Sequence, residues 1–235
     1  MEKTRTVNFC QNKEPVDYNT AVIQMNYIVD SIINGKMNEL LWFLEHPSIY
    51  TGGTSAKKVD VLNNNLFPVI KTGRGGQYTY HGPGQRVVYV MLDLKNYKRD
   101  IRQYISKLQE WLINTLDKLN IHGKTNNDRI GIWVDQDNNY SVKENKIAAI
   151  GVRIKHWVSL HGISLNINPN LDHYKGIIAC GINDHGITSL KEMGVKYPNQ
   201  YIDNILKNEF EKIFQVKLHN TNIEINNTNI QKLNR

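Results

Sequence analysis

Five glycines fall within residues 72–85, a stretch that reads TGRGGQYTYHGPGQ. Such a stretch disfavours a helix, because each interior glycine costs about 1 kcal/mol relative to alanine. It allows the backbone to approach a ligand closely and to direct N–H groups toward it. An apolar run of strand-forming residues, 86–94, follows directly. A plain surface turn is the alternative, but it needs only one or two special residues. The pattern predicts a polar binding loop attached to a buried strand.

Length and composition predict a globular chain. The 235 residues suffice for one large domain or two small ones, and 40% are hydrophobic while 22% are charged. No apolar run approaches the roughly 20 residues that cross a membrane. The N-terminus lacks the apolar segment of a secretory signal. We therefore expect a cytoplasmic protein that has no membrane partner, with Cys10 and Cys180 as free thiols.

The charge balance is basic, since 29 Lys and Arg against 22 Asp and Glu give a net charge of +7. Nucleic acid is one class of partner for a basic protein. The lysines are scattered, however, and the aromatic residues lie in apolar segments rather than alternating with Lys and Arg. An acidic protein partner explains the excess equally well. We expect no nucleic acid partner.

Hydrophobic periodicity predicts both helices and strands. Helices are expected at residues 18–33, 101–119 and 201–214, the first capped by Asp17 or Asn19 and ended by Asn34 and Gly35. Strands are expected at 40–44, 86–94, 129–134, 146–154 and 157–168. A polar loop is expected from 45 to about 66, a hairpin turn at 135–139, and a short strand or disorder from His219. Without repeats or linkers, the simplest arrangement is a single α+β domain over 1–235.

Two residues outside the glycine-rich stretch are candidates for chemistry. Cys180 precedes Gly181, so the backbone around the thiol is open; a small buried cysteine is the alternative. Lys146 begins an apolar run, where it could deprotonate a thiol or simply be solvated. His81 and His161 could serve as the base instead, because a Cys–His pair is the commoner solution. No spacing distinguishes Cys–Lys from Cys–His. Metal ligation is disfavoured because no two ligands are closely spaced.

The glycine-rich stretch also resembles a known family. RGGQYTYHGPGQ at 74–85 resembles the RGGQ-x-TYHGPGQ signature of lipoyl(octanoyl) transferases. Further blocks resemble the family in the same order: EHPSIYT at 45–51, GIWV at 131–134, KIAAIGVR at 146–153, WVSLHGISLN at 157–166, CGI at 180–182 and TSL at 188–190. The chain departs from the family pattern at Ala179, where many members have proline, at Ser164, where alanine is common, and at 51–54.

The resemblance implies an α+β fold in which a mixed β-sheet is flanked by helices, as in the catalytic domains of biotin and lipoate protein ligases. It implies a catalytic nucleophile at Cys180 and a catalytic lysine at Lys146, with no metal or cofactor. The implied substrate-binding residues are Arg74, Gly75, Gly76, Gln77, Tyr78, Thr79, Tyr80, His81, Ala149, Ile150, Gly151, Gly162, Ile163 and Ser164.

The implied reaction transfers an octanoyl or lipoyl group from acyl carrier protein to a lysine of a lipoyl domain, through a thioester on Cys180. The implied acceptors are the lipoyl domains of 2-oxoacid dehydrogenase complexes and the glycine cleavage H protein. A thioester is already activated, so the reaction needs no ATP. An ATP-dependent lipoate or biotin ligase is the nearer alternative, but it makes an acyl-adenylate and needs no nucleophilic cysteine. A nucleic-acid-binding module is the remote one, supported only by the charge.

Overall fold

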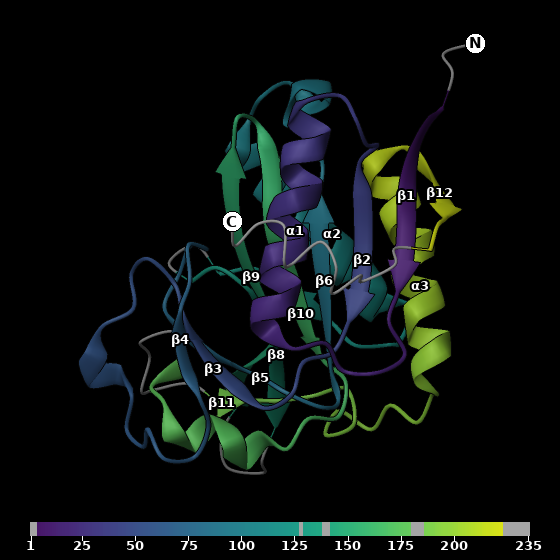
Figure 1. The fold of residues 1–235 in the computed structure, drawn as a ribbon. Coiled ribbons are helices and arrows are strands. Elements are labelled where there is room, and N and C mark those ends of the chain that lie inside the picture. The colour runs from purple at the N-terminus through teal and green to yellow at the C-terminus, as the bar shows by residue number, and fades with distance from the viewer. Residues whose placement is uncertain (1–3, 127–128, 138–141, 180–185, 223–235) are drawn as a thin grey trace.

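A computed structural model describes residues 4–126, 129–137, 142–179 and 186–222. The main feature is a mixed nine-stranded sheet whose strands follow the order β12-β1-β2-β6-β10-β9-β8-β7, with β11 paired to β9 (Figure 1). Its strands are β1 (Arg5–Gln11), β2 (Leu40–Leu44), β6 (Gln85–Met91), β7 (Gly123–Lys124), β8 (Ile132–Asp137), β9 (Val142–Lys155), β10 (Val158–Asn166), β11 (Gly186–Ile187) and β12 (Val216–Asn220). Helices cover both faces, so the predicted α+β fold, a mixed sheet flanked by helices, is confirmed.

Alternating side chains along the central strands divide the core into two layers. Leu40 and Trp42 of β2 and Tyr89 of β6 pack with helix α1 (Tyr18–Ile33) on one face. Their neighbours Leu41 and Val88 pack on the other face, against α2 (Ile101–Asp117) and α3 (Asn199–Phe214). Successive side chains of a strand point to opposite faces of the sheet, and both faces are covered here. The sequences of β2 and of residues 87–91 in β6 are therefore apolar throughout and do not alternate between polar and apolar residues.

The three helices lie where the sequence predicts them. The Asp17 carboxylate accepts a hydrogen bond from the Thr20 amide at 2.8 Å and caps α1, and Asn34 ends it. Asp100 caps α2 in the same way through the Gln103 amide. Trp111 of α2 donates its indole N–H to the Leu206 carbonyl of α3 at 2.8 Å, so these helices are joined by a buried hydrogen bond as well as by apolar contact.

The predicted polar loop from 45 to 66 is wrong in part, because it contains a strand. β3 (Ile49–Gly52) forms a second sheet with β4 (Val69–Lys71) and β5 (Tyr78–His81), in the order β4-β3-β5. This sheet forms a small lobe below and beside the large one (Figure 1). β5 also corrects the predicted glycine-rich loop in part, because Tyr78–His81 form a strand, whereas residues 82–84 form a turn before β6. Both strands were missed because their pairing partners are distant in sequence.

The remaining expectations differ in detail. The strand expected at 86–94 ends at Met91, and a 3₁₀ turn, Leu94–Tyr97, follows. The hairpin turn expected at 135–139 begins too early, since β8 continues to Asp137 and pairs with β9; residues 138 and 139 lie outside the described residues. Residues 216–220 form β12, paired with β1, so the tail begins as a strand. β1 itself was not predicted.

Candidate acyl-binding site

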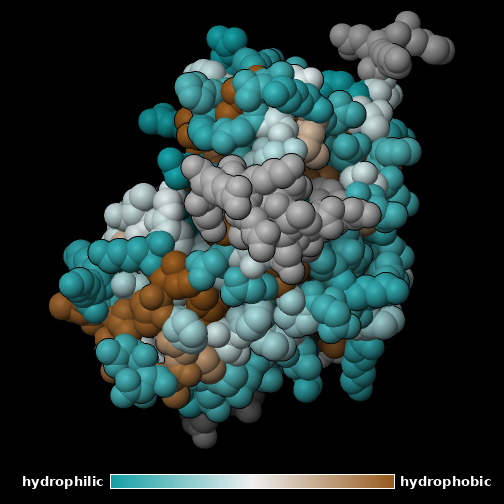
Figure 2. Space-filling model, viewed as in Figure 1, coloured by the Kyte–Doolittle hydropathy of each residue, from teal (hydrophilic) through white to brown (hydrophobic). Residues whose placement is uncertain are grey.

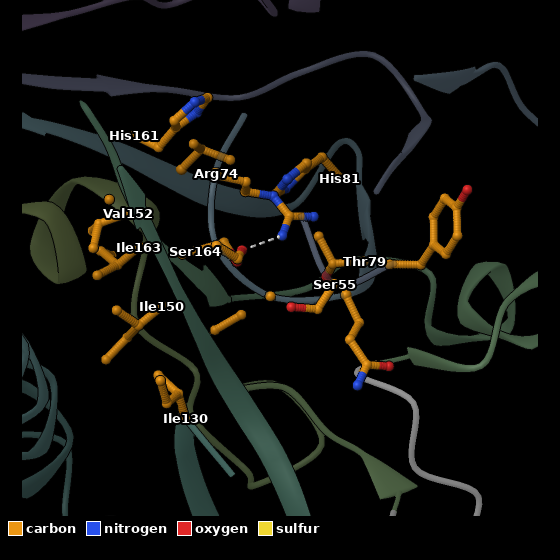
Figure 3. Close-up of a pocket in the computed structure, with 18 of the residues that line it drawn as sticks. Ser55, Arg74, Thr79, His81, Ile130, Ile150, Val152, His161, Ile163 and Ser164 are labelled. Carbon is orange, nitrogen blue, oxygen red and sulfur yellow. Dashed lines mark hydrogen bonds between the residues drawn. The ribbon is translucent and has the colours of Figure 1, made fainter. Parts of the chain in front are cut away.

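A cavity of about 420 Å³ opens where β6, β9 and β10 lie side by side beneath the glycine-rich stretch (Figure 3). Arg74, His81 and His161 gather at one end of it, whereas Ile130 and Ile150 lie toward the other (Figure 3). The complete lining is Tyr18, Ser55, Arg74, Gly75, Gly76, Gln77, Tyr78, Thr79, His81, Val87, Tyr89, Ile105, Arg129, Ile130, Lys146, Ala149, Ile150, Gly151, Val152, His161, Gly162, Ile163 and Ser164. The lining is mainly apolar with a few charged groups, as in small-molecule sites generally.

Close packing between strands β10 and β6 explains why residue 162, which lines the cavity, is a glycine. Gly162 of β10 pairs with Gly151 of β9 and with Tyr89 of β6. A Cβ at Gly162 would lie 2.2 Å from the carbonyl oxygen of Val88, which is backbone and unable to move aside. Glycine at position 162 therefore lets β10 approach β6 closely, and glycine at position 151 lets the Arg74 side chain lie against β9.

The Arg74 guanidinium is held by the small lobe. Its Nη2 donates to the Thr51 carbonyl at 2.7 Å and to the Thr51 hydroxyl at 2.9 Å, and its Nη1 donates to the Gly75 carbonyl at 2.9 Å. The amide of Gly75 donates to the Val152 carbonyl at 3.0 Å, which attaches the stretch to β9. A charged, 8% exposed arginine is therefore fixed in the cavity wall by several charge-assisted hydrogen bonds.

Three buried histidines surround this end, and all are neutral at physiological pH. Burial, then His46 and Arg74, lowers the pKa of His81 to about 3. Burial, then Arg74 and Arg153, lowers the pKa of His161 to about 3. Burial likewise lowers the pKa of His46 to about 4. Protonation of His81 or His161 would place a second charge near Arg74 in a poorly solvated environment.

Hydrogen bonds assign the tautomers of two of these rings. His46 Nδ1 lies 2.7 Å from the Val16 carbonyl, which only accepts, so Nδ1 carries the proton and Nε2 accepts from the Tyr89 hydroxyl at 2.8 Å. The Gln85 amide nitrogen donates to the Tyr80 carbonyl, so its oxygen accepts from His81 Nδ1 at 2.6 Å. His81 and His46 are therefore acceptors at Nε2, and His81 presents an unprotonated nitrogen.

Lys146 lies within β9, not at the beginning of a strand as the sequence suggested. Its ammonium donates to the Ile130 carbonyl at 2.9 Å and lies 5.3 Å from the centre of the Trp133 ring. Gly131 has φ of 144°, and a Cβ there would lie 2.3 Å from Lys146 Cε. Gly131 thus makes room for the lysine stem, which leaves the residue 5% exposed at the edge of the cavity.

A buried polar network connects the chain on both sides of residues 180–185. The Gln85 amide donates to the Tyr174 hydroxyl at 2.8 Å and to the Asn166 amide oxygen at 3.0 Å. Asn166 in turn donates to the Thr188 carbonyl at 2.9 Å. Tyr174 precedes Cys180 in the sequence and Thr188 follows it. The end of the glycine-rich stretch therefore fixes both flanks of the cysteine segment.

Most of the predicted substrate-binding residues line this one cavity, together with Lys146; Tyr80 and Cys180 are the exceptions. Tyr80 points to the other side of β5, where its ring contacts Tyr50 and Tyr174. Cys180 lies outside the described residues. The other cysteine, Cys10, is a free buried thiol on β1, and burial raises its pKa to about 12.

Several lining residues were not predicted. Tyr18 belongs to the first helix, and its burial pattern matched an ordinary core residue. Tyr89 alternates with apolar neighbours along β6 and gave no separate signal. Arg129 and Ile130 directly precede the GIWV block, so their position next to a matched motif could have indicated them.

Comparisons with known proteins agree with this geometry. The model of the lipoyl protein ligase A/B catalytic domain matches residues 17–211. An octanoyltransferase from Wolbachia pipientis is 52% identical over 200 residues, covering 85% of this chain and 95% of the relative. One from Bartonella henselae is 50% identical over 204 residues, covering 85% of this chain and 83% of the relative.

Solved structures support the fold. A bipartite lipoate protein ligase from Thermoplasma acidophilum superposes with a TM-score of 0.68 at 13% identity, covering 98% of this chain and 91% of that one. Lipoate-protein ligase A bound with ATP gives 0.66 at 15% identity, with 98% and 94% covered. Among the described residues, none of the helices has the length and apolar character that a membrane crossing requires. Sequence blocks, fold and cavity converge: the chain belongs to the octanoyltransferase family of lipoyl protein ligase A/B catalytic domains.

Proposed function

We propose that residues 1–235 form a single catalytic domain that transfers an octanoyl group from acyl carrier protein to a lysine of a lipoyl domain. The observation that carries the proposal is the cavity that joins the glycine-rich stretch to Lys146. Octanoyltransferase relatives at about 50% identity support the reaction. The names of these relatives support an octanoyl group as the acyl substrate. An archaeal lipoate protein ligase described with its E2 lipoyl domain supports lipoyl domains as acceptors.

Cys180 is the proposed nucleophile. Its neighbour Ala179 lines a small cavity together with Lys146, Thr79 and Ser164, which also line the main cavity. Ala179 is bonded directly to residue 180, and consecutive Cα atoms are about 3.8 Å apart. On the far side of the segment, Ile187 pairs with Lys146. Both flanks of residues 180–185 therefore support a thiol close to the lysine.

The reaction then proceeds in two acyl transfers, first from the carrier thioester to Cys180 and then from Cys180 to the acceptor lysine. The sulfur of Cys180 attacks the carbonyl of the carrier thioester, and the carrier thiol leaves with a proton. The amine of the acceptor lysine attacks the acyl-enzyme, an amide forms, and the Cys180 thiol is restored. We assign Lys146 to both proton transfers: its ammonium protonates the departing carrier thiolate, and the neutral amine so formed takes the proton of the attacking acceptor amine. Among the described residues, Lys146 is the charged side chain that lines the small cavity beside Ala179, and it pairs with Ile187 on the far side of the segment.

The substrate-binding residues supply an apolar wall for the alkyl chain. Ala149, Ile150, Gly151, Gly162 and Ile163 line the floor. Burial of an alkyl chain contributes up to about 0.8 kcal/mol for each CH₂. Because the donor is already a thioester, no ATP or other cofactor enters the mechanism.

Single substitutions test the proposal. Cys180→Ala and Cys180→Ser should abolish transfer from octanoyl-acyl carrier protein to a lipoyl domain, a loss of several orders of magnitude. Cys10→Ser is the matched control and should retain activity, because Cys10 is buried on β1 with a raised pKa. Transfer that continues in Cys180→Ala, or that requires ATP in the unmodified protein, would refute the proposed mechanism.

A further inference from the structure

Exposed apolar side chains gather on the small lobe, on the segment that leads into β4. Val59 is 76% exposed, Leu62 62%, Leu66 46% and Val69 36%. Figure 2 shows a brown patch over the part of the molecule that Figure 1 labels β4. Scattered exposed apolar residues are ordinary, but a contiguous patch on one short segment marks an interaction surface. We call residues 57–71 the lobe surface.

The lobe surface is also basic. Lys57, Lys58 and Lys71 are exposed on it. Between Glu45 and Asp93 the sole acidic residue is Asp60, which is 7% exposed. The lobe therefore presents positive charge with almost no compensating carboxylate at its surface. Apolar contacts within a basic rim fit an acidic partner that contributes apolar side chains of its own.

The lobe surface is joined directly to the chain that enters the cysteine segment. Leu62 and Asn63 donate their amides to the Gly176 carbonyl at 2.9 and 3.0 Å, and Ile178 donates to the Asp60 carbonyl at 2.7 Å. Val61 and Ile177 form a β-bridge. At its other end, the same segment follows Ser55, which lines the cavity. A protein seated here has the cavity and the approach to residue 180 beside it.

We propose that the lobe surface docks the acidic carrier protein that delivers the octanoyl thioester; this rests on the function proposed above. The donor must place its acyl chain in the cavity and its carbonyl at the proposed nucleophile, and the lobe contacts both the cavity, through Ser55, and the chain that leads to residue 180, through residues 176–178. The acceptor needs the sulfur and the lysine that takes up its proton. The rim beside Lys146, with Arg129 and the 57% exposed Ile130, is the nearer surface for it.

A triple variant, Lys58→Glu with Leu62→Ser and Lys71→Glu, tests the assignment. The KM for octanoyl-acyl carrier protein should rise at least about tenfold while kcat stays within about twofold. The KM for octanoyl-pantetheine, which lacks the protein, and the KM for the lipoyl domain should not change. The matched control is Lys36→Glu with Lys196→Glu, which makes the same charge change at exposed lysines elsewhere and should leave all values unaltered.

Three results would each overturn the assignment: an equal increase in KM for both octanoyl donors, no increase in any KM, or an increase confined to the KM for the lipoyl domain. Binding gives a readout that is independent of turnover: in a Cys180→Ala background, the triple change should weaken the Kd for octanoyl-acyl carrier protein about tenfold. If that weakening is found but the unmodified protein has no transferase activity, the docking surface stands and the proposed function falls. An unchanged Kd removes the docking surface whatever the activity.

Discussion

The two faces of the large sheet are covered in different ways. On the face of α2 and α3, fully buried side chains such as Leu108, Leu206 and Phe210 form the core, and the cavity reaches this face at Ile105, Ile150 and Ile163. On the face of α1, packing is continuous over β2 but gives way to the cavity where β6, β10 and β9 lie under the glycine-rich stretch. We call the face covered by α2 and α3 the sealed face, because apolar packing closes most of it. We call the face covered by α1 the open face, because a charged arginine and neutral histidines take the place of part of its core.

The difference shows how a single sheet serves both purposes. A strand places alternate side chains on opposite faces, so β6 contributes Val88 to the sealed layer and Tyr89 to the cavity. Changes on the sealed face should alter the free energy of unfolding, and changes on the open face should alter catalysis. The following substitutions test that separation, beginning with the largest effect.

Lys146→Met should give the largest loss. Methionine keeps most of the apolar stem but removes the ammonium that donates to Ile130. We expect transfer to fall at least about 100-fold, because proton transfer by a positioned group typically contributes this much. Alkylation of Cys180 by iodoacetamide should also slow, since a neighbouring cation favours the thiolate. The protein should fold normally by circular dichroism; unchanged alkylation and turnover would return the base assignment to His81 or His161.

Leu108→Ala tests the sealed face. The side chain is fully buried between α2 and the sheet, so its truncation should lower the free energy of unfolding by about 2–5 kcal/mol. Urea unfolding measures the loss. The KM for the octanoyl donor should stay unchanged below the transition, because Leu108 is fully buried in the core and is not among the residues that line the cavity. A large change in KM would show that the two faces are not separable.

Because His46, His81 and His161 are buried and neutral, we expect the free energy of unfolding to decrease in acid. Their folded-state pKa values of about 4 for His46 and about 3 for His81 and His161 lie below the ordinary value of about 6.5. The unfolded chain therefore binds more protons below about pH 6.5. The free energy of unfolding should fall from there toward the folded pKa, by up to about 1.4 kcal/mol per pH unit for each histidine.

Urea unfolding at about pH 7 and about pH 5 measures this slope. His161→Asn should flatten it, because asparagine does not titrate and tolerates the φ of 60° at this position. Exposed His122 gives the matched control, and His122→Asn should leave the slope unchanged. A slope that is the same in the His161 variant would mean that this histidine is not buried neutral.

Gly151→Ala should have the smallest effect. Its Cβ would lie 3.1 Å from Arg74 Cδ and 3.4 Å from the Gly75 carbonyl, so the cavity wall must shift by a few tenths of an ångström. We expect a cost of about 1 kcal/mol, which corresponds to about a fivefold rise in KM for octanoyl donors. A loss of stability without any change in KM would place Gly151 with the sealed face instead.

Local patterns predicted the helices and the central strands well. The apolar run from Leu40 to Leu44 has the length of a buried strand, and the apolar residues of α2 recur at the three-to-four spacing of a helix. Each pattern can therefore be recognised within its own segment. β1, β3, β4 and β5 were missed because they are defined by partners elsewhere: Arg5 pairs with Val216, a partner that no short window contains. Long-range pairing is the information that propensity lacks.

The site was predicted unevenly for a similar reason. The blocks that resemble the family indicated Arg74, Lys146 and the glycines, because each of these residues lies within a matched block. They did not indicate Tyr18 or Tyr89, whose residue types are ordinary for a core and whose role comes only from facing the cavity. Tyr80 shows the converse, since it lies within the motif but faces away from the cavity.

Intact mass measurement after incubation with octanoyl-acyl carrier protein tests the central claim most directly. We predict that the protein gains the mass of one octanoyl group without ATP, and that peptide mapping places the group on Cys180. Hydroxylamine should remove it, as expected for a thioester. The Cys180→Ala variant should gain no mass, and Cys10→Ser should behave as the unmodified protein does. An adduct that forms only with ATP, or that persists in Cys180→Ala, would contradict the account.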